Sequence, residues 1–281
     1  MHIKQSHQWG NYLKSLGWES LYIPQAIRIK PLLFWSAIKI QRPSQISEEF
    51  LNKVDKIARE KRALFTIIEP KTCENENIFP KHRYRPYKEP LSFTKTIVVD
   101  LKPSLETLLK SFSKDTRQKI KRETEFKIGL NPILVEEFYK LFAQTAKRKK
   151  FWIPPLLEIK TKISSFGGDV FVVTAFYKKT PTAVALILIH EKTAYYEHAA
   201  HNPTTNKDAP YNILWETIKE CKKRNLRTLD LCGIYDTRFS KATKKWEKFT
   251  IFKKKWGGSV LTYPTPYIKY YPRNFIPFRY S

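Results

Sequence analysis

Residues 170–200 read VFVVTAFYKKTPTAVALILIHEKTAYYEHAA, and this segment organises the rest of the chain. It contains apolar runs separated by short polar connections, and these runs span residues 170–177, 182–190 and 194–200. Connections of so few residues join strands that run in opposite directions. The segment therefore predicts an antiparallel β-meander.

Helical and extended patterns continue on both sides of the meander. Apolar residues at helical spacing predict helices at 105–112, 115–127, 135–148 and 209–224, and another that begins after Ser47. Apolar runs predict strands at 32–40, 63–68, 96–101, 228–232 and 258–263. The basic, proline-containing segment 70–90 predicts a loop or lid. Together these elements predict a mixed α/β sandwich of the kind seen in acyltransferases.

The length and composition indicate a folded chain. Its 281 residues are 42% hydrophobic and 14% aromatic, which is enough for two modest domains. Cys73, Cys221 and Cys232 have no spacing typical of a zinc site or a disulfide framework, which favours a reducing compartment. The first residues lack the apolar stretch of a signal peptide, and the longest aliphatic run, 183–189, is too short to span a bilayer. We therefore expect a cytoplasmic protein.

The charge of the chain indicates a polyanionic partner. There are 52 Lys and Arg against 26 Asp and Glu, a formal net charge of +26 that is spread along the chain. Nucleic acid, an acidic membrane surface and a substrate with a diphosphate all fit such a surface, and charge alone does not rank them. A lysine-rich composition with no functional meaning is the alternative interpretation.

The segment Phe252-Lys253-Lys254-Lys255-Trp256-Gly257-Gly258 is the strongest candidate for chemistry. A lysine fixed beside an aromatic ring and a glycine turn can stabilise an oxyanion through a permanent charge. Phe252 and Trp256 are expected to pack the turn, while the two glycines allow a tight bend or a close approach to a ligand. From spacing alone, Lys253 is also compatible with a solvated lysine on a strand.

These residues form part of a longer resemblance to the Fem family of peptidoglycan bridge-forming aminoacyltransferases. The segments that carry it are Gln5-Ser6, Trp9-Gly10, Gly17-Trp18, Asp115-Thr116-Arg117 with Ile120, Thr145 with Arg148 and Phe151, Ala194-Tyr195-Tyr196, Ala209-Pro210 with Leu214-Trp215, Leu229-Asp230 with Gly233-Ile234, and Phe252-Lys253 with Trp256-Gly257. The chain departs from the family in having Trp256 where Phe is usual, and in lacking an inserted helical arm.

The resemblance implies a fold, a reaction and a set of partners. The fold is two acetyltransferase-like (GNAT-like) domains with mixed sheets: residues 1–102, completed by 265–281, and a catalytic domain at 103–264. The reaction is transfer of an amino acid from aminoacyl-tRNA, a co-substrate used without a cofactor, to an amine of a peptidoglycan precursor. The precursor is a muramyl-pentapeptide that is either UDP-linked or lipid-linked.

The same resemblance implies the roles of individual residues. Lys253, with Phe252 beside it, is implied to be catalytic. The implied substrate-binding residues are Arg148, Arg117, Tyr196, Tyr195, Asp230 and Trp256. Arg148 suits a diphosphate, although cations also favour the end of a helix on electrostatic grounds alone. Tyr195 and Tyr196 alternate across a strand, so we expect one to be buried and the other to face the substrate groove. Asp230 equally fits a buried structural partner.

A lysine-rich surface is the candidate binding site for tRNA. Its members are Lys241, Lys244, Lys245, Lys248, Lys254 and Lys255, and the first four are interleaved with Trp246 and Phe249. Phosphates bind cations, and an unstacked base can lie on an aromatic face. A solvated helix face remains the alternative. The aromatic and basic segment 263–280 suits either peripheral contact with the inner face of the cytoplasmic membrane or packing against the first domain.

Other functions are compatible with parts of this pattern. An N-acyltransferase of the same fold that acts on another amine is one of them. Its acetyl-CoA-dependent form is disfavoured because Gly129, Gly167, Gly168 and Gly233 form no pyrophosphate loop at the start of a helix. A non-catalytic RNA-binding protein fits the charge but shows no standard RNA-binding motif. His198 and His201 do not have the partners at the spacing that a metal site needs, so no metal is expected.

Overall fold

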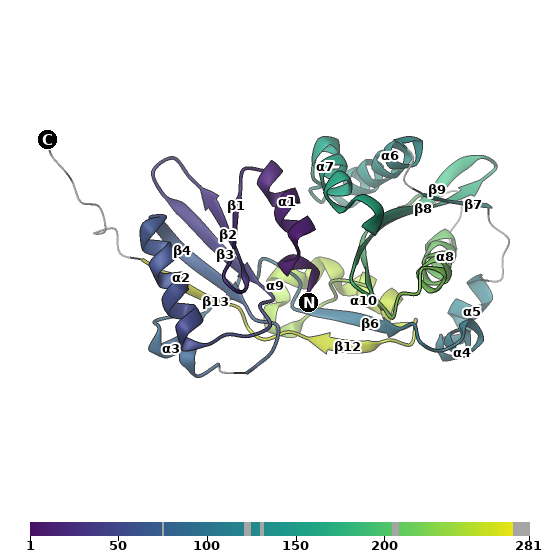
Figure 1. Cartoon of the computed structure of the whole chain (residues 1–281). Helices are drawn as coiled ribbons and strands as arrows, with labels where there is room; N and C mark the ends of the chain where they lie inside the picture. The colour runs from purple at the N-terminus through teal and green to yellow at the C-terminus, as the bar shows by residue number, and fades with distance from the viewer. Residues whose placement is uncertain (75, 121–124, 130–131, 204–207, 272–281) are drawn as a thin grey trace, which may run out of the picture. The chain divides into compact units, whose positions relative to one another are not determined.

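The computed structural model describes residues 1–74, 76–120, 125–129, 132–203 and 208–271 (Figure 1). The chain packs as two compact units. Unit 1 contains Met1–Thr94, Asp236–Lys244 and the chain from Thr262 onward, and unit 2 contains Lys95–Tyr235 and Lys245–Leu261. Each unit contains a mixed β-sheet with helices, so the predicted mixed α/β fold is confirmed.

Unit 1 is built on a six-stranded sheet in the order β1-β2-β3-β4-β13-β5. The strands are β1 (Glu19–Tyr22), β2 (Ala26–Pro31), β3 (Ser36–Gln41), β4 (Ala63–Glu69), β5 (Arg85–Pro86) and β13 (Tyr267–Tyr270). Its helices are α1 (His7–Ser15), α2 (Glu48–Glu60), α3 (Ile78–Lys81) and α9 (Ser240–Thr243). Only β3 and β4 pair in parallel, because α2 carries the chain back between them.

Helix α2 shows how the sequence specifies this unit. The Ser47 hydroxyl accepts from Phe50 N at 3.1 Å and caps the helix, while Glu48 and Glu49 lie at the positive end of its dipole. Its apolar face, which includes Leu51 and Val54, is buried in the core of the unit. The predicted helix after Ser47 is confirmed.

Strand β13 completes the sheet of unit 1 from a position far along the chain. It lies between β4 and β5, with Ile268 opposite Ile67. Asp55 of α2 ties it down: Lys269 Nζ lies 2.6 Å from Asp55 Oδ2, and the Tyr271 hydroxyl donates to Asp55 Oδ1 at 3.0 Å. The buried carboxylate is thus bonded to a cation and a hydroxyl from this returning segment.

Unit 2 is built on a seven-stranded sheet in the order β12-β6-β11-β10-β9-β8-β7. The strands are β6 (Lys95–Asp100), β7 (Glu125–Gly129), β8 (Val170–Tyr177), β9 (Thr180–His190), β10 (Thr193–His201), β11 (Thr228–Asp230) and β12 (Ser259–Thr262). Strands β8, β9 and β10 form the predicted antiparallel meander, which is therefore confirmed. Strand β11 joins β10 in parallel after the crossover helix α8.

Helices cover both faces of this sheet. They are α4 (Leu105–Ser111), α5 (Lys114–Ile120), α6 (Pro132–Lys149), α7 (Leu156–Phe166), α8 (Ala209–Lys223) and α10 (Glu247–Lys254). Figure 1 shows α6 and α7 on one side of β8 and β9, and α8 on the other. Residues on both faces of the central strand β9 are consequently buried, from Thr182 to His190.

Three expectations need correction. Of the strand predicted at 32–40, only the part from Ser36 onward is a strand, β3. Residues 32–35 form the turn between β2 and β3, which the Leu32 N to Trp35 O hydrogen bond closes at 2.8 Å, and this apolar turn has the composition of a strand. The helix predicted at 115–127 ends with α5 at Ile120, and 125–129 form β7 because β8 offers a pairing edge; residues 121–124 lie outside the described residues. The segment 70–90 contains the short elements α3 and β5.

The boundary between the units falls before β6. This strand pairs with β11 of unit 2, whereas the predicted first domain extends to residue 102. Residues 236–244 lie within the predicted second domain, 103–264, but pack in unit 1. A boundary inferred from punctuation residues such as Pro103 does not detect pairing with a strand that follows much later.

Gly257 and Gly258 make a tight bend against neighbouring backbone. Gly257 has a φ of 65°, in the left-handed region, and a Cβ there would lie 2.9 Å from Ser111 O. A Cβ on Gly258 would lie 2.7 Å from Val98 O and 2.7 Å from Ile97 Cγ2. The glycines therefore allow β12 to lie against β6.

We expect Gly258→Ala to destabilise the protein by about 1–3 kcal/mol, because the added methyl group forces β12 away from Val98. Gly168→Ala is the matched control, since a Cβ at Gly168 meets nothing within 4 Å. Its effect should stay within about 0.5 kcal/mol. Urea unfolding of both variants measures the difference, and equal midpoints would contradict the packing argument.

Candidate active site

A sharp turn follows β11 and shapes the candidate site. Leu231 N donates to Ile97 O at 2.8 Å and Ile234 N donates to Lys95 O at 3.0 Å, so the chain follows β6 on both sides of the turn. Between them Cys232 has a φ of 56°, in the left-handed region that a residue with a side chain seldom adopts. The turn therefore needs a specific stabilising contact.

Asp230 supplies that contact. The side chain is buried, and its Oδ1 accepts from Cys232 N at 2.7 Å and from the Thr96 hydroxyl of β6. One carboxylate oxygen thus holds the left-handed residue to the neighbouring strand. Of the two roles that the sequence left open for Asp230, these contacts favour the structural one.

Lys253 lies in the last turn of α10 and contacts this turn. Its Nζ donates to Cys232 O at 2.9 Å and to Gly233 O at 2.7 Å. The side chain is half-buried, and this burial lowers the pKa of Lys253 to about 8 despite the opposing influence of Cys232 and Asp230. Lys253 therefore lies in a helix and not on the strand that the spacing also allowed. Its charge is not permanent as expected, because the lowered pKa means that the ammonium deprotonates near pH 8.

Four aromatic rings pack at the end of α10. Trp256 is fully buried, with its ring centroid 4.9 Å from that of Phe112 and 6.0 Å from that of Phe252. The half-buried Phe252 also meets Tyr211 of α8 edge-on at 5.0 Å. Trp256 is therefore a core residue in this structure, and Phe252 links α10 to α8 next to Lys253.

Lys255 is held by an ion pair within the unit. Its Nζ lies 2.6 Å from Asp115 Oδ2, and Lys119 approaches the same carboxylate at 2.9 Å. These contacts raise the pKa of Lys255 and of Lys119 and lower the pKa of Asp115. Among the predicted tRNA-binding lysines, Lys241, Lys244, Lys245, Lys248 and Lys254 are exposed, so Lys255 differs from them in environment.

Arg148 lies in a cluster of cations at the end of α6. Arg148 Nη2 donates to His201 O at 2.8 Å, and Lys149 Nζ lies 4.6 Å from the centre of the Phe249 ring in α10. Burial, followed by the charges of Arg148 and Lys248, lowers the pKa of Lys149. Burial and the same group of cations also lower the pKa of His201 to about 4. Arg148 and Lys248, which were predicted to bind different substrates, therefore lie near the same residue, Lys149.

Arg117 and the tyrosines have structural contacts. Arg117 Nη1 donates to Lys110 O at 2.9 Å and to Phe112 O at 3.0 Å, which satisfies carbonyl groups at the end of α4. Tyr195 and Tyr196 are both buried, so the expectation that one faces a groove is wrong. The reason is that β10 lies inside the sheet and both α6 and α8 pack against it.

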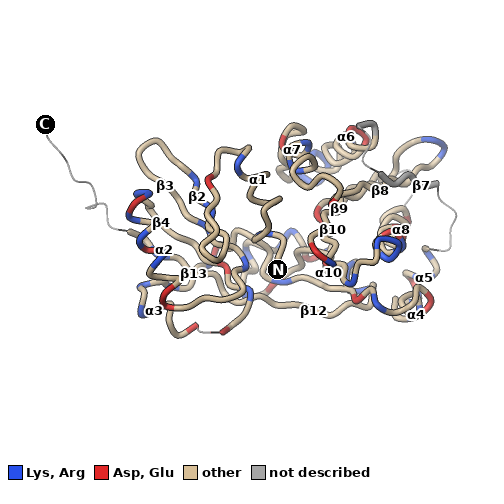
Figure 2. Tube along the Cα trace, viewed as in Figure 1, with Lys and Arg blue, Asp and Glu red and all other residues tan. Residues whose placement is uncertain are grey.

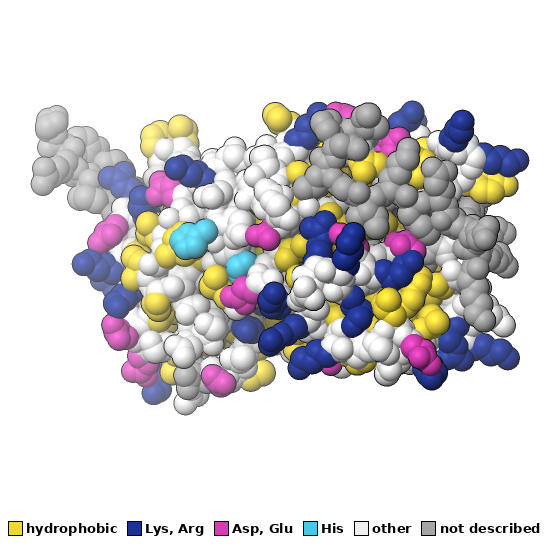
Figure 3. Space-filling view, turned by 45° about the vertical axis from the view of Figure 1, so that its right-hand side comes forward, with side chains coloured by type: hydrophobic (Ala, Val, Ile, Leu, Met, Phe, Trp, Pro, Cys, Tyr) yellow, Lys and Arg dark blue, Asp and Glu magenta, His cyan; other side chains and the backbone are white. Residues whose placement is uncertain are grey.

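Lys and Arg occur throughout both units (Figure 2). On the face shown in Figure 3, these side chains alternate with carboxylates and apolar patches instead of forming one continuous field. The contacts of Lys149 with Phe249 and of Lys253 with two carbonyls were not predicted from the sequence. The basic run 147–150 could have indicated the contact of Lys149 with an aromatic ring. The contact of Lys253 with backbone carbonyls could not be found in this way, because every residue has a carbonyl and the sequence shows no pattern for such a bond.

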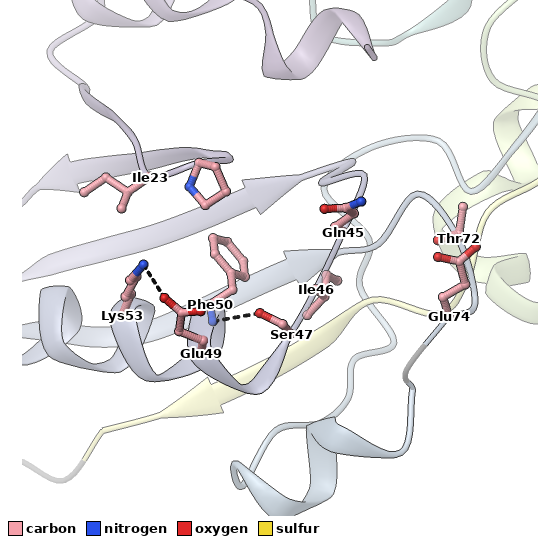
Figure 4. Close-up of a pocket in the computed structure, with 10 residues that line it drawn as sticks. Ile23, Gln45, Ile46, Ser47, Glu49, Phe50, Lys53, Thr72 and Glu74 are labelled. Carbon is pink, nitrogen blue, oxygen red and sulfur yellow. Dashed lines mark hydrogen bonds and ion pairs between the residues drawn. The ribbon is translucent and has the colours of Figure 1, made fainter.

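A separate cavity of about 700 Å³ lies in unit 1 (Figure 4). It is lined in part by Ile23, Phe50 and Glu74, and by Glu49, which pairs with Lys53 at 2.7 Å. No predicted site residue lines it. In the described part of the chain, no three or more His, Cys, Asp and Glu residues come together as a metal site would require. Nor is any helix there long and apolar enough to cross a membrane.

Sequence comparison gives a partial match to a known domain family. Residues 110–241 match the family model of an acetyltransferase (GNAT) domain. No curated protein sequence matches the chain. The matched segment runs from α5 past β11, includes the meander and the Asp230 turn, and ends before Lys253.

Solved structures of low sequence identity share the fold over most of the chain. The crystal structure of FemX is similar with a TM-score of 0.81 at 13% identity, covering 96% of this chain and 92% of that one. The C-terminal domain of a protein described as a lysylphosphatidylglycerol synthetase, from Agrobacterium fabrum, has a TM-score of 0.61 at 14% identity, covering 95% and 87%. L-PGS from Bacillus licheniformis has a TM-score of 0.61 at 12% identity, covering 90% and 84%. The chain therefore has a Fem-like fold.

We expect Lys253 to react with acetic anhydride with a pH midpoint of about 8 in the folded protein. In urea the midpoint should return to the ordinary value of 10.5, because water again surrounds the amine. Competitive labelling followed by peptide mass spectrometry measures both midpoints. The same midpoint in folded and unfolded protein would show that the amine is not desolvated.

We expect Asp230→Ala to destabilise the protein by about 2–4 kcal/mol, because Cys232 N and the Thr96 hydroxyl lose their buried acceptor. Asp230→Asn keeps an oxygen at Oδ1 and should cost less. Urea unfolding measures stability, and the labelling midpoint of Lys253 reports on the turn. Equal losses in both variants would argue against the role of Oδ1.

Proposed function

We propose that this chain is a tRNA-dependent aminoacyltransferase that acts on an amine of a peptidoglycan precursor stem peptide. The observation that carries the proposal is the position of Lys253 Nζ, desolvated and fixed by two carbonyls in an acyltransferase-like fold. The Phe252-Lys253 segment is also the most specific part of the resemblance to Fem aminoacyltransferases.

The chemistry needs little more than a positioned cation. The acceptor amine attacks the ester carbonyl carbon of aminoacyl-tRNA and forms the C–N bond. The C–O bond to the ribose then breaks, and the ribose hydroxyl leaves with the proton that the amine gives up. Two N–H groups of Lys253 bind Cys232 O and Gly233 O, and its third donates to the oxyanion that forms between these steps. Aminoacyl-tRNA is the co-substrate, and the proposed reaction uses no cofactor.

The cations of unit 2 support a polyanionic substrate. Burial, and then the charges of Arg148 and Lys248, lower the pKa of Lys149, so anion binding there relieves the repulsion among these cations. Lys245 and Lys254 are exposed and add to the surface available to phosphates. We assign the tRNA acceptor end or the diphosphate of a UDP-linked or lipid-linked muramyl-pentapeptide to this surface.

The second candidate is an N-acyltransferase that acts on another amine. The match of residues 110–241 to an acetyltransferase domain favours it. Gly167 and Gly168, however, follow α7 at its C-terminal end, and the carbonyl of Gly233 accepts a hydrogen bond from Lys253. None of these three glycines therefore forms a phosphate-binding loop at the start of a helix. Both substrates of the leading proposal occur in the cytoplasm, which is where we place the protein.

We expect the purified protein, mixed with charged tRNA and muramyl-pentapeptide precursors, to add one amino acid to the precursor. Lys253→Ala should lower the rate by about 10²–10³-fold, because the oxyanion loses its cation. Lys223→Ala is the matched control, since Lys223 is an exposed lysine in the last turn of another helix, α8, and should retain the rate. The wild-type advantage over Lys253→Ala should fall as pH rises through about 8, because the amine then loses its charge. Acceptor mass measures transfer.

The alternatives give different results in this assay. Transfer of an acetyl group from acetyl-CoA, with none from tRNA, would identify an N-acyltransferase. Retained tRNA binding with no transfer to any amine would identify an RNA-binding protein. Equal losses in Lys253→Ala and Lys223→Ala would remove Lys253 from the reaction.

A further inference from the structure

The turn between β2 and β3 exposes a continuous apolar tip in unit 1. Leu32, Leu33 and Phe34 are 44%, 89% and 70% exposed, although residues of these types are usually buried. The hydrogen bond from Leu32 N to Trp35 O closes the turn and fixes its shape. In Figure 1 this turn is the end of the β2–β3 hairpin. A folded chain gains nothing from presenting such side chains to water, so the tip suits an external partner.

Cations stand beside the base of this tip. Ser36 N donates to Arg62 O at 3.1 Å, and the Ser36 hydroxyl donates to Lys61 O at 2.8 Å. Trp35, Arg59 and Arg62 line the same small cavity. The turn between α2 and β4 is therefore held against the hairpin.

The acids of this region do not cancel the cations. Lys61 pairs with Glu19 at 2.6 Å, and Glu60 is exposed nearby in sequence, whereas Arg59 and Arg62 are exposed and add positive charge. An apolar tip with an arginine border is complementary to an anionic lipid surface, where aliphatic and aromatic groups enter the headgroup boundary and cations meet phosphates. A single turn is too narrow for a stable protein interface, which buries about 800 Å² on each partner.

We propose that the 32–34 tip, with Arg59 and Arg62, docks unit 1 on an anionic phospholipid bilayer. The site is distinct from the aromatic segment 263–280 that the sequence suggested for membrane contact. Tyr271 lines the same cavity as Trp35. The proposal does not depend on the transfer reaction, because binding can be measured without substrates.

The test is co-sedimentation of the full chain with vesicles of phosphatidylglycerol and phosphatidylcholine, and with vesicles of phosphatidylcholine alone. We expect binding to the anionic vesicles to be at least about tenfold stronger. Leu33→Ser with Phe34→Ser should lower that binding about tenfold or more, because the apolar anchor is lost. Arg59→Gln with Arg62→Gln should lower it and weaken its dependence on salt.

The matched control is Leu157→Ser with Ile251→Ser, which removes two exposed apolar side chains from unit 2. Its binding should stay within about twofold of the wild type, since scattered surface residues do not anchor a protein. Thermal unfolding verifies each variant, and Phe34→Ser alone replaces the double variant if that does not fold.

Three results would overturn the proposal. The first is unchanged binding when the tip is altered. The second is loss of binding on deletion of residues 272–281 while the tip variant still binds, which would make that segment the anchor. The third is a change from dimer to monomer in the tip variant without vesicles, measured by sedimentation velocity, which would make a second copy of the chain the occupant.

Discussion

The candidate site depends on an ammonium group held by two backbone carbonyls. Lys253 can contact Cys232 O and Gly233 O only because the chain turns through a left-handed residue at 232. This left-handed turn depends on the Oδ1 atom of Asp230, which accepts from Cys232 N. A buried carboxylate thus sets the position of the lysine, whose burial lowers its pKa although the charge of Asp230 acts in the opposite direction.

Cations bonded to carbonyls recur elsewhere in the chain and change the meaning of its net charge. Arg117 and Arg148 donate to the ends of structural elements, and the buried Arg28 donates to Ser6 O at 2.9 Å. Because backbone carbonyls accept hydrogen bonds from these side chains, a carboxylate partner is not needed beside each cation. The excess of 26 positive charges is therefore partly internal, and only the exposed members are available to phosphates.

Periodicity was sufficient to predict the meander and α2, because their apolar faces repeat at the spacing of the element. It failed at 32–40, where an exposed apolar turn has the composition of a strand. It also failed at 115–127, where residues from 125 onward pair with β8 as a strand although their apolar residues have helical spacing. For the site, the family resemblance indicated Lys253, but its carbonyl partners follow from the φ of Cys232. Tyr195 and Tyr196 were misjudged because alternation does not show that both faces of a sheet are covered.

The insertion of β13 between β4 and β5 has a consequence for biosynthesis. Lys269 meets Asp55 across 214 positions, so β4 has an open edge until nearly the whole described chain has left the ribosome. Unit 2 has all its strands by residue 262, and unit 1 is completed later although it is begun first. An unpaired strand edge invites pairing with other nascent chains, so the interval before β13 arrives is when this protein is most exposed to aggregation.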